Sequence, residues 1–277
     1  MDEGGADREA FAGRTILVVL AHPDDESIAC GGTLARLADA GARVILLCAT
    51  RGERGGPTGP VRDDTLAQAR VSELVRAAST LGLAEVILMD HPDGELRWED
   101  VPLFHAEIVA TIRRYAPACV ITFGDDGLYW HGDHIGVHER VRTALGSLGD
   151  QAPPMYGVTM PRGMIPRIAE AAAAMGWTPP QKGFWSLNPN AFGLHAASPT
   201  IVVDVRPWVA RKLVAMRSHE SQIGHGHPFD RIDAAQAEEW LGVEYLHRSA
   251  AHSVKGRVLE PLDSTDRPAS AAEAADH

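Results

Sequence analysis

The stretch TILVVLAHPDDESIACGG, residues 15–32, joins a short apolar segment to an acidic one. Residues 15–21 are β-branched and apolar on both faces, which is typical of a central strand in a parallel sheet. The strand ends at His22, and Pro23 disfavours a helical conformation at that histidine. Two aspartates and a glutamate follow directly. Adjacent unpaired carboxylates at the end of a buried strand repel each other, so the segment predicts a bound divalent cation.

The succession of an apolar strand and a helix recurs along the chain as far as residue 149. Further strands are expected over 42–50, 85–90 and 118–124, and helices over 27–41, 65–82, 104–117 and 134–149. This alternation is typical of an α/β fold with a mostly parallel central sheet flanked by helices. Such sheets bind ligands beyond the carboxyl ends of their strands. One rim is therefore expected to gather the segments HPDDE, TRGE, DHPDG and FGDDGLYWHGDH, each of which follows a strand.

The rest of the chain is less regular. Residues 1–13 are polar and are expected to form a flexible N-terminus, and residues 264–277 a disordered tail. Residues 14–263 are expected to form a single domain. Within it, residues 151–199 are rich in proline, glycine and aromatic side chains and predict an irregular C-terminal cap, followed by a strand over 200–205.

Composition excludes several kinds of partner. The 277 residues carry a formal net charge of −11, which argues against nucleic acid and against an anionic membrane surface. The three cysteines lie in apolar surroundings without a CxxC pair, as reduced structural thiols do. The first residues lack the apolar core of a signal peptide, and no apolar run approaches the length of a membrane span, so a cytoplasmic location is expected.

A third metal ligand is expected from HGDHIGVH, residues 131–138. His131 and His134 are three residues apart, and His134 and His138 are four apart, so one helical turn can direct any two of them at one point. Two histidines and one carboxylate leave an open position on zinc, as in a catalytic site.

Simpler roles exist for the same side chains. Asp25 or Glu26 can complement the dipole at the start of the following helix. Asp133 can be the N-cap of its own helix, and His138 can be a packing or surface histidine.

The motifs AHPDDE and HGDH, each after a strand, resemble those of the PIG-L/LmbE family of zinc-dependent N-deacetylases. TRGERG, ARVSELVRAASTLGL, DHPDG and KLVAMRSHESQ also have counterparts in that family, so the resemblance covers most of the chain. It implies a Rossmann-like fold and a zinc-dependent hydrolase. The implied reaction removes an acetyl or other acyl group from the amide nitrogen of an amino sugar, such as an N-acetylglucosamine conjugate, by attack of a metal-bound water.

The resemblance also implies roles for residues of the two main motifs. His22, Asp25 and His134 would be the metal ligands, for Zn²⁺ or another divalent metal such as Fe²⁺. Asp24 would be the general base, and His131 would stabilise or protonate the reaction intermediate. A cationic imidazole at that place could hold the developing oxyanion.

Outside the ligand set, the resemblance implies four further roles. Asp133 would orient His131 or a ligand, and Arg70 and Asp93 would contact the sugar. Tyr129 would lie near the oxyanion, although Trp130 occupies a position that is often small in the family.

Other functions remain open from the sequence. A thiol-conjugate amidase would also cut a glucosamine amide, and a non-catalytic metal-binding module would need no general base. A two-metal phosphodiesterase would recruit Asp125 and Asp126. A nucleotide-dependent oxidoreductase is disfavoured because the first turn lacks G-x-G-x-x-G. The expected partner is a small amino-sugar conjugate, and a homo-oligomer is possible. The histidines of GHGHPFD, residues 224–230, are expected in a surface loop.

Overall fold

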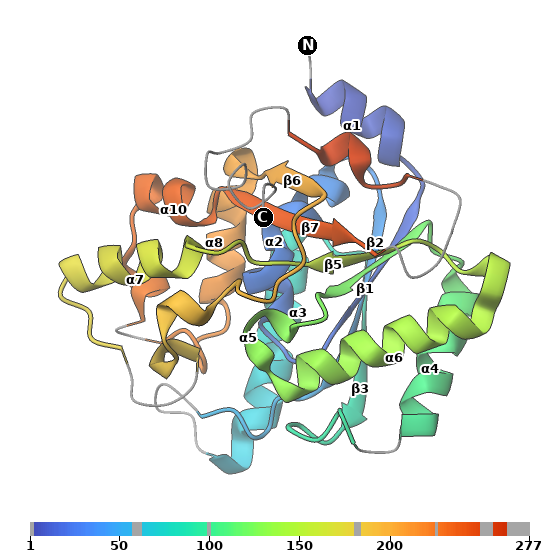
Figure 1. Ribbon diagram of the computed structural model, residues 1–277, viewed down its shortest axis with the longest axis horizontal. Coiled ribbons are helices and arrows are strands. Elements are labelled where there is room, and N and C mark those ends of the chain that lie inside the picture. The colour runs from blue at the N-terminus through green and yellow to red at the C-terminus, as the bar shows by residue number, and fades with distance from the viewer. Residues whose placement is uncertain are drawn as a thin grey trace.

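The apolar segments identified in the sequence form a single seven-stranded sheet in the order β3-β2-β1-β4-β5-β7-β6 (Figure 1). The computed structural model describes residues 3–56, 63–98, 101–179, 184–224, 227–249 and 257–264. The strands are β1 Thr15–Leu20, β2 Arg43–Thr50, β3 Glu85–His91, β4 Cys119–Phe123, β5 Met155–Val158, β6 Ile201–Asp204 and β7 Val243–Arg248. The strands from β3 to β5 pair in parallel, and β7 runs antiparallel to both β5 and β6. The predicted α/β fold with a mostly parallel sheet is therefore confirmed.

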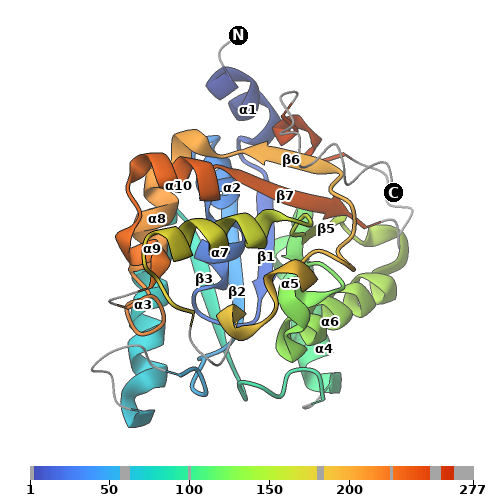
Figure 2. The same ribbon diagram turned by 60° about the vertical axis from the view of Figure 1, so that its left-hand side comes forward.

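Helices cover both faces of this sheet. The helices in the described part of the chain are α1 Glu3–Phe11, α2 Asp25–Asp39, α3 Leu66–Leu81, α4 Val101–Tyr115, α5 Gly127–Trp130, α6 Gly132–Leu148, α7 Met164–Ala174, α8 Val209–Arg217, α9 Pro228–Arg231 and α10 Ala234–Leu241. Helices α2, α3 and α8 pack together on one face, and α4 and α6 pack together on the other (Figure 2). In the described part of the chain, no helix is both long and apolar enough to cross a membrane.

The order of the strands determines where a ligand can bind. Strand β1 lies between β2 and β4: the chain runs from β1 outward to β2 and β3, and then returns to form β4 on the other side of β1. The loops after β1 and β4 therefore diverge, and a crevice forms between them at the carboxyl ends of these strands. Residues 16–20 of β1 are fully buried, so the strand is a rigid base for the loop that follows.

Two regions differ from the sequence expectation. Residues 3–11 form a helix in place of a flexible segment, because Phe11 is fully buried and Asp7 pairs with the buried Arg36 of α2 at 2.6 Å. The cap over 151–199 contains β5 and the helix α7, whose Ile165 and Ile168 are buried against the core. The expected tail lies outside the described residues except for Ser264.

Candidate active site

The loop after β1 places three polar side chains at the crevice. His22 lies in the bend that follows β1, and its backbone N–H donates to Oδ2 of Asp25 at 2.8 Å. The carbonyl of Asp24 accepts from the N–H groups of Ser27 and Ile28, both at 3.0 Å, so Asp24 precedes the first turn of α2. Asp24 itself has φ 119°, a conformation that non-glycine residues adopt only when their surroundings hold it.

The loop after β4 places the second group of histidines. His131 is the residue before α6, and its Nδ1 accepts from the backbone N–H of Asp133 at 3.3 Å. The histidine is therefore the N-cap, and the alternative that Asp133 caps this helix is wrong. Leu128 and Trp130 have φ values of 66° and 61°, so this loop also holds strained backbone.

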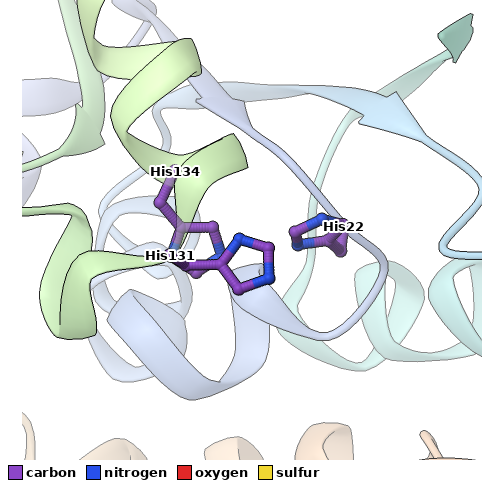
Figure 3. Close-up of side chains that lie close together, drawn as sticks. All are labelled: His22, His131 and His134. Atoms are coloured by element: carbon purple, nitrogen blue, oxygen red, sulfur yellow. The ribbon is translucent and has the colours of Figure 1, made fainter. Parts of the chain in front are cut away.

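Figure 3 shows how the two loops bring three imidazole rings together, with His131 and His134 at the start of α6 and His22 after β1. The ring centroids of His22 and His131 are 4.9 Å apart, and those of His131 and His134 are 4.6 Å apart. One ring nitrogen of each histidine lies within 4.8 Å of the others. The three rings are thus close enough for a single cation to contact more than one of them.

The tautomer of His134 is determined by its neighbour. Nδ1 lies 3.1 Å from the carbonyl oxygen of Gly127, which accepts a hydrogen bond and so requires the proton on Nδ1. In the neutral ring that a metal ion requires, Nε2 then carries the lone pair. It is buried without a hydrogen-bond partner and lies 3.2 Å from Oδ1 of Asp25. A lone pair facing a carboxylate in a buried site is unfavourable, and a divalent cation held by both groups removes that cost. The residues present therefore fit a metal ion.

The ring of His22 is held by carboxylates, two of which contact its Nε2 atom. Nε2 lies 3.1 Å from both Oδ1 of Asp93 and Oδ2 of Asp133, and Nδ1 lies 3.4 Å from Oδ2 of Asp25. Asp133 also accepts from the N–H groups of Gly94 at 2.6 Å and Leu96 at 3.0 Å. A carboxylate that holds one imidazole nitrogen and leaves the other toward the metal is the usual support for a metal-binding histidine.

Charges in the cluster shift the pKa values of its members. Burial alone would lower the pKa of His22, but hydrogen bonds with Asp133, Asp25 and Asp93 hold it well above its usual value. Burial would raise the pKa of Asp25, and the nearby His134 and His22 hold it well below the usual value instead. Burial lowers the pKa of His131 to about 4, with the two other histidines acting in the same direction. His131 is therefore neutral at pH 7, in contrast to the cationic imidazole considered from the sequence.

Asp24 has an environment unlike that of Asp25. Burial raises the pKa of Asp24 to about 6, against the lowering effect of Arg70. An Nη2 atom of Arg70 lies 3.1 Å from Oδ2 of Asp24 and 2.6 Å from the carbonyl oxygen of Pro23. Asp24 is thus a carboxylate that can both hold and release a proton near neutral pH.

The other predicted site residues lie around this cluster. Tyr129 packs edge-on against His131 and His134, with ring centroids 5.5 and 5.3 Å apart, and burial raises the pKa of its hydroxyl. Asp93 is 6% exposed, and its Oδ2 accepts from the N–H of Arg54 at 2.8 Å. Arg70 is 4% exposed.

Some histidines and acids of the motifs lie outside the cluster. Nδ1 of His138 lies 2.9 Å from the carbonyl oxygen of Phe123, so His138 is a packing residue. Asp125 is exposed, and Asp126 accepts from the N–H of Leu128 at 3.0 Å. His227 is the N-cap of α9 and accepts from the indole N–H of Trp185 at 3.1 Å.

The structure adds one residue that sequence analysis did not assign to the site. His219, which follows α8, lies 2.7 Å from Oε1 of Glu26, and both side chains are fully buried. His219 belongs to the segment KLVAMRSHESQ, whose resemblance to family sequences is the signal that points to it.

Comparison with known proteins places this chain in a family. Residues 17–145 match the PIG-L family, described as GlcNAc-PI de-N-acetylase. The 1D-myo-inositol 2-acetamido-2-deoxy-alpha-D-glucopyranoside deacetylase of Thermobispora bispora is 32% identical over 271 residues, which cover 85% of this chain and 88% of that protein.

Two solved structures have the same fold at low identity. The N,N'-diacetylchitobiose deacetylase of Pyrococcus horikoshii has 23% identity and a TM-score of 0.59, with 87% of each chain covered. The 4-carboxy-2-hydroxymuconate hydratase GalB of Pseudomonas putida KT2440 has 21% identity and a TM-score of 0.59, with 88% of this chain and 99% of GalB covered. Because one is a deacetylase and the other a hydratase, the fold alone does not determine the reaction. The family match and the identity to the Thermobispora protein do: the chain belongs to the PIG-L family of de-N-acetylases.

Proposed function

We propose that this protein is a metal-dependent hydrolase that removes the acetyl group from the amide nitrogen of an N-acetylglucosamine conjugate. Its membership of a de-N-acetylase family supports the reaction class. The observation that carries the proposal is the buried Nε2 atom of His134, which faces Asp25 and has no hydrogen-bond partner. Zn²⁺ is the proposed metal and Fe²⁺ the alternative, since imidazole and carboxylate ligands suit both.

The metal ligands follow from the protonation of each ring. His134 offers Nε2, and His22 offers Nδ1, because its Nε2 faces two carboxylates. Nδ1 of His131 accepts a backbone hydrogen bond, so the neutral ring carries its proton on Nε2 and is a donor. Asp25, which lies beside both His22 and His134, is therefore the third ligand.

Asp24 is the proposed general base. A divalent cation in this site supplies a polarised amide carbonyl and a water whose pKa falls toward about 7. Asp24, with a pKa of about 6, is ionised at neutral pH and close enough to that range to take up a proton and return it to the leaving amine. Arg70 lies against Asp24, so we assign it to orienting the base, beside the sugar contact that the resemblance implies.

His131 and Tyr129 are the proposed donors to the oxygen that becomes negative during the reaction. His131 is neutral with a proton on Nε2, and the buried hydroxyl of Tyr129 keeps its proton because its pKa is raised. Loss of one such donor typically reduces the rate about 10²–10³-fold. Asp133 and Asp93 hold His22, and this positioning is their proposed role.

The substrate is proposed to be a small amino-sugar conjugate. The Thermobispora relative is named for an inositol-linked N-acetylglucosamine, so that disaccharide is the first candidate. No nucleic acid or membrane surface fits the charge of −11.

The test is release of primary amine from a panel of N-acetylglucosamine conjugates by the zinc-loaded protein. The panel includes the inositol disaccharide and thiol-linked glucosamine amides, and free acetate is measured beside the amine. The Asp24→Asn variant should bind equal zinc and lose at least about 10²-fold in kcat. Asp39→Asn, the same change on a half-exposed helical residue, should keep full activity.

Three outcomes contradict the proposal. Absence of amine release across the panel despite bound zinc argues for a non-catalytic metal module. Amine release without acetate argues for an amidase of larger acyl groups. Full activity in Asp24→Asn removes Asp24 as the base.

A further inference from the structure

The backbone of Asp24 is held in a conformation that the residue would not adopt by itself. Its φ of 119° lies in the region that favours glycine. A non-glycine residue stays there only when several contacts restrain it. At Asp24 the carbonyl is fixed by α2 and the carboxylate by Arg70, so the remaining restraint is at the amide.

Glu26 supplies that restraint. Its Oε2 accepts from the backbone N–H of Asp24 at 3.0 Å. Its Oε1 accepts from the hydroxyl of Ser27 at 2.6 Å and lies 2.7 Å from Nε2 of His219. Both oxygens of Glu26 are therefore engaged by neighbouring protein groups.

His219 is in turn held by its contact with Glu26. Its Nε2 contacts Glu26 and, at 3.5 Å, the hydroxyl of Ser27, while its Nδ1 has no hydrogen-bond partner. Both side chains have zero exposure. Burying two ionisable groups is expensive, and apolar residues of similar volume often give equal or higher stability. A role other than stability is therefore the better explanation for this pair.

We propose that Glu26 and His219 are positioning residues that hold the amide of Asp24 and thereby aim its carboxylate for proton transfer. The inference rests on the proposed function of Asp24 as general base. Misplacement of a reacting group by about 1 Å can reduce a rate about 10²-fold, and relaxation of φ at Asp24 would rotate its side chain relative to the metal ligands.

The test replaces the pair by apolar residues of similar volume. The double variant E26L/H219L should bind zinc as the wild type does, with KM within threefold and kcat reduced about 10²-fold. E26Q retains an oxygen for the Asp24 amide and should keep kcat within tenfold of the wild type. This split between kcat and KM, with rescue by the conservative variant, is not expected from a merely structural pair.

The matched control is a second buried ion pair that joins α8 to β7 and also holds backbone amides of α2. Lys212 of α8 lies 2.6 Å from Glu244, which accepts from the N–H groups of Gly32 and Thr33 in α2. K212M/E244L also removes a buried ion pair and leaves amides without partners. It should lower the melting temperature and leave kcat unchanged.

Hydrogen exchange of the Asp24 amide tests the contact without a substrate. In the metal-free wild type this amide should exchange slowly, in E26Q it should stay slow, and in E26L/H219L it should exchange at least tenfold faster. The exchange rate of this amide can be measured even if no conjugate is hydrolysed. If the double variant does not fold, the rate can still be measured in E26Q.

Several results would overturn the inference. They are a fast-exchanging Asp24 amide in the wild type, an unchanged kcat in the folded double variant, and a loss of kcat in E26Q equal to that in E26L/H219L. Parallel losses of kcat in the pair variant and the control would assign the effect to stability.

Discussion

Gly52 offers a way to displace Arg70 without changing Arg70 itself. It lies in the loop after β2 with φ +66°, and a Cβ at this position would lie 2.3 Å from Nη1 and 2.4 Å from Cζ of Arg70. Arg70 cannot easily move aside, because Nη1 donates to the Gly52 carbonyl at 2.8 Å and Nη2 donates to the Pro23 carbonyl at 2.6 Å. Gly52→Ala should therefore push the guanidinium away from Asp24.

The free energy of this change has two parts. A non-glycine residue with positive φ costs about 1–2 kcal/mol. Displacing a buried guanidinium from its acceptors adds about 1.5–3 kcal/mol, the usual contribution of a hydrogen bond to a charged group. Gly13 has φ +74°, and a Cβ at that position would have no neighbouring atom within 4 Å, so Gly13→Ala measures the first part alone. We expect Gly52→Ala to lower the free energy of unfolding by about 2.5–5 kcal/mol and Gly13→Ala by about 1–2 kcal/mol.

Urea unfolding of a double-mutant cycle checks the reasoning. The cycle compares Gly52→Ala in the wild type and in Arg70→Ala, where no guanidinium is left to displace. In the second background its effect should fall to that of Gly13→Ala. An equal effect in both backgrounds, or a wild-type effect no larger than that of Gly13→Ala, would refute the steric argument.

Three further predictions concern the acid, the metal and the packing of α6. The pKa of Asp24 in the folded protein, about 6, lies above its ordinary value of 3.8. The free energy of unfolding of the metal-free wild type should therefore fall as the pH rises through this range. Asp24→Asn should be more stable than the wild type by up to about 3 kcal/mol at pH 8 and almost equally stable at pH 4, as urea titrations can measure. Zinc at 100 times its Kd should stabilise the wild type by about 2.7 kcal/mol and should not stabilise His134→Ala, as scanning calorimetry with metal analysis can check. Gly136→Ala places a Cβ 2.8 Å from the backbone N of Arg97 and should destabilise the protein by about 1–3 kcal/mol in thermal unfolding, whereas Gly132→Ala, with open space around it, should not.

The fold was predictable where strands are apolar on both faces and helices separate them. Residues 15–21 and 118–124 predict β1 and β4, and their polar continuations locate the crevice, because parallel strands end on the same edge of the sheet. Strand β5 has only four residues after two prolines, too few to show a period. Its pairing with β7, almost ninety residues later in the chain, is a tertiary contact that no local pattern reveals.

Within the site, residue type was easier to predict than atomic role. The sequence narrows the metal ligands to a few acids and histidines, but His131 and His134 occupy the same helical turn. Their roles are distinguished by what their Nδ1 atoms contact, a backbone N–H in one and the carbonyl of Gly127 in the other. The loop before these histidines contains positive φ values at Leu128 and Trp130, which are unusual for such residues and are not encoded by propensity.

The same strain links the two halves of the site. The described non-glycine residues with positive φ are Asp24, Ala116, Leu128 and Trp130, and all but Ala116 lie in the two loops at the crevice. Each strained residue of these loops adjoins a histidine, a carboxylate or Tyr129, so relaxing the backbone would move a functional side chain. A buried sheet holds both loops, and the strained conformations cost of order 1–3 kcal/mol each. Substitutions that relieve them should stabilise the fold and weaken the reaction together, which is the relation expected when strain serves to aim side chains.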